Sequence, residues 1–152
     1  MAEPPPREGS RTSNALECAL SFLDIWYGRP RAAATIAYDP QDPLSLLRGE
    51  VGGRDRAERT LGAPFRYLGP DGSALRVLGD RLHDLGHGHA ALIVNGWHPD
   101  EGTGTHAWNA CNQEGRVLWV DAATGERGPD VLHPNVHGVW VIVTGPDGRG
   151  MK

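Results

Sequence analysis

The sequence predicts an α+β domain in which one buried N-terminal helix packs on a mostly antiparallel sheet. Two observations predict this class. Residues 14–27 are apolar over most of the circumference of a helix, and residues 90–144 contain four runs rich in β-branched and aromatic residues, separated by turn residues. Because 152 residues suit one hydrophobic core, we expect a single domain.

The two ends of the chain differ in composition from the middle. Residues 1–12 are polar and rich in proline, and residues 145–152 are polar and rich in glycine. Neither stretch has apolar residues to bury. We therefore predict a disordered lead or linker at 1–12, a folded domain at 13–144 and a disordered tail at 145–152.

The first expected element is a helix that starts at Asn14, a favourable N-cap residue, and stops at Gly28. Its polar stripe is narrow and consists of Glu17, Ser21 and Asp24. A helix with so little polar surface is typical of a buried position, so we expect it at the centre of the domain.

The later elements follow from periodicity. Prolines and glycines interrupt residues 29–68, where we expect only short helical turns. Leucines at helical spacing then predict an amphipathic helix at 73–85. The remaining runs predict strands at 90–97, 106–112, 115–122 and 137–144.

Composition excludes several functional classes. The formal net charge is −4, and no basic cluster of the kind that binds nucleic acid is present. No apolar run is long enough to cross a bilayer, and the first residues lack the order of a signal peptide, so we expect a soluble chain. Cys18 and Cys111 are too few for a disulfide scaffold, and we expect no bond between them.

The most informative segment is a predicted β-hairpin between His106 and Asp121. If its turn is centred on residues 113–114, His106 lies directly opposite Asp121, and Trp108 opposite Trp119 on the same face. Opposed side chains point to one side with Cβ atoms about 4.5–5.5 Å apart, so the imidazole can bind the carboxylate. A three-residue loop would instead place them on opposite faces.

This pair suits nucleophilic catalysis by a thiol. A carboxylate on one imidazole nitrogen fixes the tautomer and stabilises the imidazolium that forms when the other nitrogen takes a thiol proton. A cysteine at a helix N-terminus has a lowered pKa, so the helix start near Asn14 is the expected place for the nucleophile. His106 and Asp121 are also compatible with a plain cross-strand polar contact.

Other candidate groups favour structural roles. His87, His89 and His98 lie among glycines without cysteines or carboxylates at ligand spacing, which indicates loops, and we expect no metal site and no cofactor. Cys18 on an apolar helix face is typical of a packed small residue.

Three parts of the chain match a family pattern. They are Asn14 with Cys18-Ala19 and Gly28-Arg29-Pro30, Gly-Thr-His-Ala-Trp-Asn at 104–109, and Val-Asp-Ala-Ala-Thr-Gly at 120–125. In these segments the sequence resembles the papain-fold toxin domains of bacterial polymorphic toxins (Tox-PL), which are grouped with glutamine deamidases.

The resemblance implies a papain-like fold and a Cys-His-Asp triad that deamidates glutamine in a target protein, with an immunity protein as a further partner. A protease or transamidase that uses the same triad, and a binding module without catalysis, are the alternatives. As part of a larger toxin the chain would be secreted or delivered into a target cell; otherwise it would be cytoplasmic.

The chain departs from the family at the nucleophile. In relatives the helix opens with Asn followed by Cys, whereas Asn14 is followed here by Ala15. Either Ala15 is an engineered replacement of the catalytic cysteine, or Cys18 is the nucleophile; we favour the first, because Cys18 lies deeper in the helix. We expect oxyanion or substrate contacts at Asn14, Trp108 and Ala123, where relatives often carry Gln at the last position.

Overall fold

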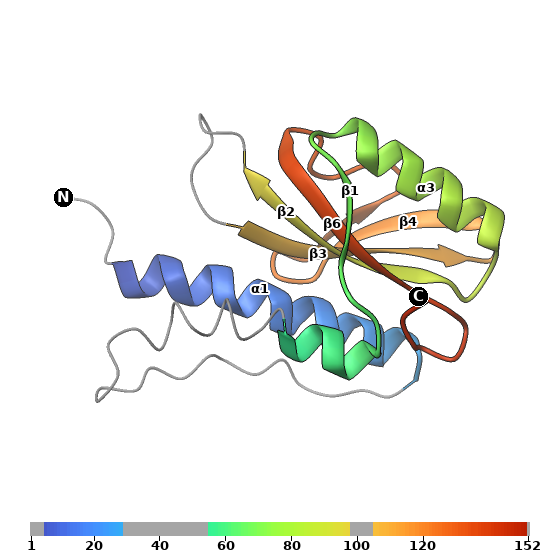
Figure 1. Cartoon of the computed structure of the whole chain (residues 1–152), viewed down its shortest axis with the longest axis horizontal. Helices are drawn as coiled ribbons and strands as arrows, with labels where there is room; N and C mark the ends of the chain where they lie inside the picture. Colours follow the sequence, from blue (N-terminus) through green and yellow to red (C-terminus); the bar gives the residue numbers. More distant parts are fainter. Residues whose placement is uncertain (1–4, 29–54, 98–104, 152) are drawn as a thin grey trace.

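The computed structural model describes residues 5–28, 55–97 and 105–151, with side chains from residue 15 onward (Figure 1). Residues 55–61 are helical. The other helices are α1 (Pro5–Trp26) and α3 (Ser73–Leu85), and the strands are β1 (Arg66–Gly69), β2 (Ala90–Trp97), β3 (Thr105–Gln113), β4 (Arg116–Asp121), β5 (Glu126–Gly128) and β6 (Val136–Thr144).

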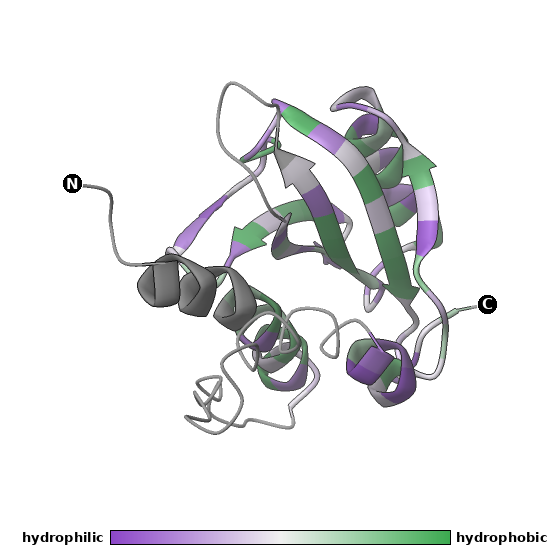
Figure 2. Ribbon diagram, turned by 60° about the vertical axis from the view of Figure 1, so that its left-hand side comes forward, coloured by the Kyte–Doolittle hydropathy of each residue, from purple (hydrophilic) through white to green (hydrophobic). Residues whose placement is uncertain are grey.

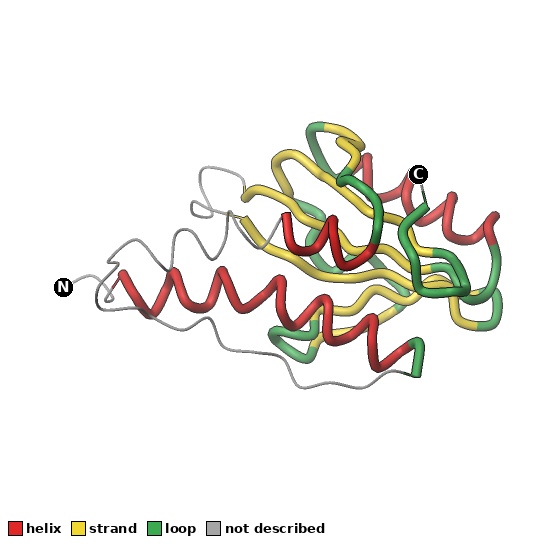
Figure 3. Tube along the Cα trace, turned by 60° about the horizontal axis from the view of Figure 1, so that its bottom comes forward, coloured by secondary structure: helices red, strands yellow, loops and turns green. Residues whose placement is uncertain are grey.

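The strands form one sheet in the order β1-β6-β2-β3-β4-β5, and every neighbouring pair is antiparallel. Helical segments lie on both sides of this sheet, with α1 and α3 on opposite sides (Figures 1 and 3). The fold is therefore α+β, as the sequence predicts. The short strands β1 and β5 are not predicted, since four and three residues carry too little periodicity to detect.

Each face of the sheet has its own core. One cluster joins α1 and residues 57–65 to Ala107, Cys111 and Ile142. The other joins α3 to Trp108, Trp119 and neighbouring residues of β2 and β6. Figure 2 shows the hydrophobic segments along the central strands, between the two helical layers. Each fully buried Leu, Ile or Val stabilises the fold by roughly 1.5–3 kcal/mol.

The N-terminal helix begins earlier than the sequence predicts. It starts at Pro5, nine residues before Asn14, and includes residues expected in a disordered lead. Proline is compatible with the first turn of a helix, since its missing N–H would have no helical partner there. Residue 15 consequently lies well inside α1, where the field of the helix terminus has largely decayed. The expectation that position 15 lies at the start of the helix is therefore wrong for this chain.

The C-terminal residues 145–151 fold back on the domain, although the sequence places them in a disordered tail. The Gly150 N–H donates to the Leu61 carbonyl at 2.7 Å, and the Met151 N–H donates to the Val143 carbonyl at 2.7 Å. A Cβ at position 150 would meet the Ala63 Cβ at 2.6 Å. Glycine therefore permits this close approach, which composition alone does not reveal.

Among the described residues, no helix is both long and apolar enough to cross a membrane.

Candidate active site

The β3-β4 hairpin positions the candidate site, and its register differs from the expected one. The turn is at Glu114 and Gly115, whose φ angles of 56° and 87° suit a two-residue type I′ turn. Cys111 consequently pairs with Leu118, not with Arg116. The expected direct opposition of His106 and Asp121, and of Trp108 and Trp119, is therefore wrong. A shift by an even number of residues nevertheless keeps each pair on one face of the sheet.

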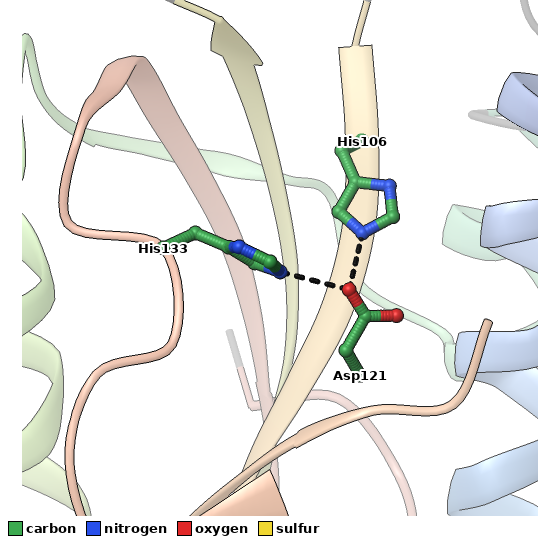
Figure 4. Close-up of side chains that lie close together, drawn as sticks. All are labelled: His106, Asp121 and His133. Carbon is green, nitrogen blue, oxygen red and sulfur yellow. Dashed lines mark hydrogen bonds and ion pairs between the residues drawn. The ribbon is translucent and has the colours of Figure 1, made fainter. Parts of the chain in front are cut away.

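The expected contact between imidazole and carboxylate is present. The Nε2 atom of His106 lies 2.6 Å from Oδ2 of Asp121 (Figure 4). In the observed register the two residues form a diagonal pair, which a long side chain such as histidine can span. The predicted proximity of His106 and Asp121 is confirmed, by a geometry other than the predicted one.

Asp121 is fully buried and its carboxylate is satisfied on both oxygens. Oδ1 accepts the backbone N–H groups of Ala123 at 3.0 Å and Thr124 at 3.3 Å. Oδ2 accepts His106 and also His133, whose Nε2 lies 2.8 Å away. Burial raises the pKa of Asp121, but the hydrogen bonds and positive charge of the two histidines hold it well below its usual range. Asp121 is therefore an ionised acceptor.

His133 is the residue of this cluster that sequence reasoning missed. It lies between β5 and β6, and its ring contacts Trp108 at 4.7 Å and His106 at 5.3 Å between centroids. Loop residues carry no periodic signal, so nothing in the local sequence indicates that this segment folds over the hairpin.

Two residues expected at the substrate, Trp108 and Ala123, make hydrogen bonds within the protein. Trp108 is fully buried, and its indole N–H donates to Oδ1 of Asn95 at 2.7 Å. Trp108 therefore packs beside His133 inside the core, and its full burial does not favour the expected role as an oxyanion or substrate contact. The Ala123 side chain is exposed, while its backbone N–H binds Asp121, so Ala123 orients the carboxylate.

The helix α1 holds the positions expected to supply the nucleophile. Ala15 is 1% exposed and belongs to the same cluster as Ala107, the neighbour of His106 in β3. Cys18 is half-buried; burial and then the charge of Asp121 raise the pKa of its thiol. This environment disfavours a thiolate at Cys18. Asn14 lies within α1, and its side chain is outside the described set.

The remaining cysteine has no catalytic geometry. Cys111 is fully buried in the core, and burial raises the pKa of its thiol to about 11. No disulfide bond joins Cys18 and Cys111.

The site has a hairpin half, which consists of His106 and Asp121 with His133 bound to Asp121, and a helix half, which consists of residue 15 and Cys18 of α1. The two halves belong to different faces of the sheet. Strand alternation assigns His106 to the face of Trp108, under α3, whereas Ala15 packs with Ala107 on the opposite face. The β3-β4 pairing ends at the Asn109–Val120 pair, and the charge of Asp121 beyond it acts on the Cys18 thiol of α1. In Figure 4 the blue ribbon of α1 lies on the side away from His133, and the Nδ1 atom of His106 points to that side.

Some of the other histidines have structural contacts. Nδ1 of His87 accepts the backbone N–H of Glu114 at 2.8 Å, and Nδ1 of His89 lies 3.1 Å from the Gly86 carbonyl. Both residues therefore support loops, and His98 lies outside the described residues. The ligand atoms of His106, Asp121 and His133 lie within 4.8 Å of one another, a donor set that transition metals also accept.

Comparison with protein families adds to this geometry. A family model described as papain fold toxin 1, glutamine deamidase, matches residues 13–126. The chain belongs to this papain-fold toxin family. The matched part includes residue 15, Cys18, His106 and Asp121, and it ends before His133. A comparison with curated proteins finds no match.

Proposed function

We propose that this papain-fold toxin domain is built as a cysteine-dependent deamidase that converts a glutamine side chain of a target protein to glutamate. One observation carries the proposal: the buried carboxylate of Asp121 binds Nε2 of His106 at 2.6 Å. A family of glutamine deamidases supplies the reaction class. A buried imidazole-carboxylate pair supplies the acid-base chemistry of acyl transfer.

The hydrogen bonds decide which nitrogen of His106 works on the substrate. An ionised carboxylate only accepts hydrogen bonds, so Nε2 of His106 must be the donor. In the neutral ring the proton acceptor is then Nδ1, which faces the side of α1 (Figure 4). The pair is thus oriented to take a proton from a thiol on α1.

In the proposed reaction the thiol of a cysteine at position 15 gives its proton to Nδ1 of His106, and the thiolate attacks the carboxamide carbon of glutamine. The tetrahedral intermediate collapses as Nδ1 returns the proton to the leaving nitrogen, which departs as ammonia and leaves a thioester. Water then loses a proton to Nδ1 and attacks the thioester; the C–S bond breaks, glutamate is released, and Nδ1 returns the proton to the sulfur, which restores the thiol. Asp121 orients His106 and stabilises its imidazolium throughout.

Position 15 suits the nucleophile better than Cys18. Ala15 packs in the cluster of Ala107, which directly follows His106, and family members carry cysteine after the helix asparagine. The pKa of the Cys18 thiol is raised by burial and by Asp121, which is the opposite of activation. With alanine at position 15, the chain shown here is expected to bind its target without turnover.

That expectation supports a second candidate, a binding module on the same fold. Its specific observation is the absence of any thiol at position 15. Proteolysis and transamidation would use the same thiol, imidazole and carboxylate, and they differ from deamidation only in the bond that is broken or in the acceptor that replaces water.

The test compares the Ala15 chain with Ala15→Cys, Ala15→Cys/Cys18→Ala and Ala15→Cys/His106→Ala. Each protein is incubated with purified candidate targets, and intact and peptide mass spectra are recorded together with ammonia release. We expect a gain of about 1 Da at a target glutamine, with release of ammonia, only with Ala15→Cys and with Ala15→Cys/Cys18→Ala. Target cleavage would replace deamidation by proteolysis, and amine incorporation would replace it by transamidation.

The outcomes also separate the nucleophiles. If the Ala15 chain itself modifies the target, and if a Cys18→Ala variant of that chain does not, the reaction belongs to Cys18. Target binding without any modification, in all variants, would support the binding module and overturn the proposed enzyme.

A further inference from the structure

Asp121 binds a second histidine, His133, which lies outside the residues matched by the family model. His133 follows the matched residues 13–126 and reaches the site from the segment between β5 and β6. Its Nε2 lies 2.8 Å from Oδ2 of Asp121, the same oxygen that His106 contacts at 2.6 Å (Figure 4). Because an ionised carboxylate only accepts, both imidazoles donate an N–H to this oxygen.

The hydrogen-bond acceptor sites of the Asp121 carboxylate are all in use. Its two oxygens offer about four acceptor sites. Ala123 and Thr124 donate backbone N–H groups to Oδ1, and His106 and His133 donate to Oδ2. Such a carboxylate cannot rotate without breaking a bond, and the four hydrogen bonds that it accepts stabilise its charged form, which opposes transfer of the Nε2 proton from His106.

We propose that His133 is a positioning residue, which fixes Oδ2 of Asp121 on Nε2 of His106 and keeps a proton gained at Nδ1 on the imidazole. Its catalytic consequence rests on the deamidase function proposed above. The hydrogen-bonding part holds for the Ala15 chain as it stands, whether or not the protein turns over a substrate.

Packing against neighbouring side chains holds the ring of His133 in place. Its ring lies at a steep angle of 76° to Trp108, with centroids 4.7 Å apart, and Trp108 is itself held by Asn95. Its side chain is 16% exposed. The ring is therefore held by neighbours before any substrate arrives, so little ordering remains to be done during the reaction.

A metal site is the competing interpretation of the same three residues, because their ligand atoms lie within 4.8 Å of one another. The separations of 2.6 and 2.8 Å between nitrogen and oxygen favour hydrogen bonds, which place a proton between each pair of atoms. A metal ion would have to replace the protons that the Nε2 atoms of His106 and His133 donate to Oδ2 of Asp121. Metal binding is accordingly an outcome of the test.

The first measurement is NMR of the Ala15 chain and of two matched variants, His133→Gln and His133→Met. The two side chains have similar length and no charge, but only glutamine retains an N–H donor. We expect the carboxyl ¹³C titration of Asp121 to move to higher pH in His133→Met and much less in His133→Gln. We also expect the Nε2–H proton of His106 to exchange faster in His133→Met.

The second measurement uses the same variants in the Ala15→Cys background. The rate of thiol alkylation should fall about tenfold in His133→Met, since one charge-assisted hydrogen bond is lost, and should recover in His133→Gln. The acid limb of the pH-rate profile should shift to higher pH in His133→Met, because Asp121 is then protonated more readily. His83→Met, at an exposed histidine of α3, is the control and should change neither property.

Unchanged Asp121 and His106 signals in His133→Met would overturn the positioning role. Equal losses in the Gln and Met variants would assign His133 to packing alone. Addition of Zn²⁺ to the Ala15 chain provides the last check: loss of both Nε2–H signals, with binding that requires His133, would replace the positioning role by metal ligation. Because the NMR measurements need no turnover, failure of the deamidase proposal remains distinguishable from failure of this one.

Discussion

The hairpin half and the helix half of the candidate site differ in how completely they are built. On the hairpin, the Asp121 carboxylate is buried, ionised and bonded to two imidazoles and two backbone N–H groups. On α1, position 15 lacks a thiol, and the pKa of the Cys18 thiol is raised. For the proposed deamidase, this comparison means that the acid-base pair is in place, whereas the nucleophile is missing or unactivated.

The largest expected effect concerns His106. In the Ala15→Cys protein, replacing His106 with alanine should lower the deamidation rate by about 10²–10⁴-fold, because the proton acceptor and donor is removed. The matched control is His83→Ala on the exposed surface of α3, which should retain the full rate. Mass spectrometry of the target over time measures both rates. A loss of rate below threefold in His106→Ala would show that His106 takes no part in the deamidation.

The next largest effect concerns Trp108, which packs against His133 of the hairpin half. Trp108→Ala should destabilise the fold by about 3–5 kcal/mol, since it removes a fully buried ring beside His133. Trp108→Phe retains most of the ring but leaves the Asn95 oxygen without its indole donor, and should cost about 1–3 kcal/mol. Urea denaturation measures both values. Equal stabilities of the two variants would contradict the described packing.

The pH dependence of stability tests the charge of Asp121. Its pKa is lowered in the folded state, so its contribution is present above the unfolded value of about 3.9 and is lost as pH falls toward the folded value. Asp121→Asn should therefore remove on the order of 2 kcal/mol of stability at pH 7, and less at pH 3. Urea denaturation at several pH values checks this, with Asp147→Asn in an exposed turn as the control. A loss that is independent of pH would argue against an ionised Asp121.

The smallest effect concerns the turn that sets the register. Glu114 has a positive φ of 56°, which asparagine adopts more readily than glutamate. Glu114→Asn should therefore stabilise the hairpin by a few tenths of a kcal/mol, up to about 1 kcal/mol. Thermal unfolding monitored by circular dichroism measures the gain, and a clear destabilisation would contradict the type I′ turn.

The sequence predicts regular elements well where periodicity is strong. The helix at 73–85 agrees with α3, and the four predicted strands overlap β2, β3, β4 and β6. Glu114-Gly115 sets the hairpin register, because two consecutive residues must adopt positive φ, and a turn placed one residue earlier shifts every pair by two. The contact of His106 with Asp121 was predictable because an even shift preserves the faces.

Other features depend on contacts between distant segments. His133 reaches Asp121 because the chain between β5 and β6 folds over the hairpin, and no local pattern encodes this path. The helix start was predicted from a capping residue at Asn14, but Asn14 lies inside a longer helix. The burial of Trp108 likewise depends on its hydrogen bond to Asn95 in the neighbouring strand.

The most direct test of the two-halves account is the alkylation of the Ala15→Cys protein, followed by peptide mass spectrometry at several pH values. One molecule then reports on position 15 and on Cys18 together. We predict that the thiol at position 15 reacts at least about 100-fold faster than Cys18 near neutral pH, and that His106→Ala abolishes the difference. Equal rates at the two positions, or a difference that survives His106→Ala, would contradict a nucleophile at position 15 activated by the hairpin.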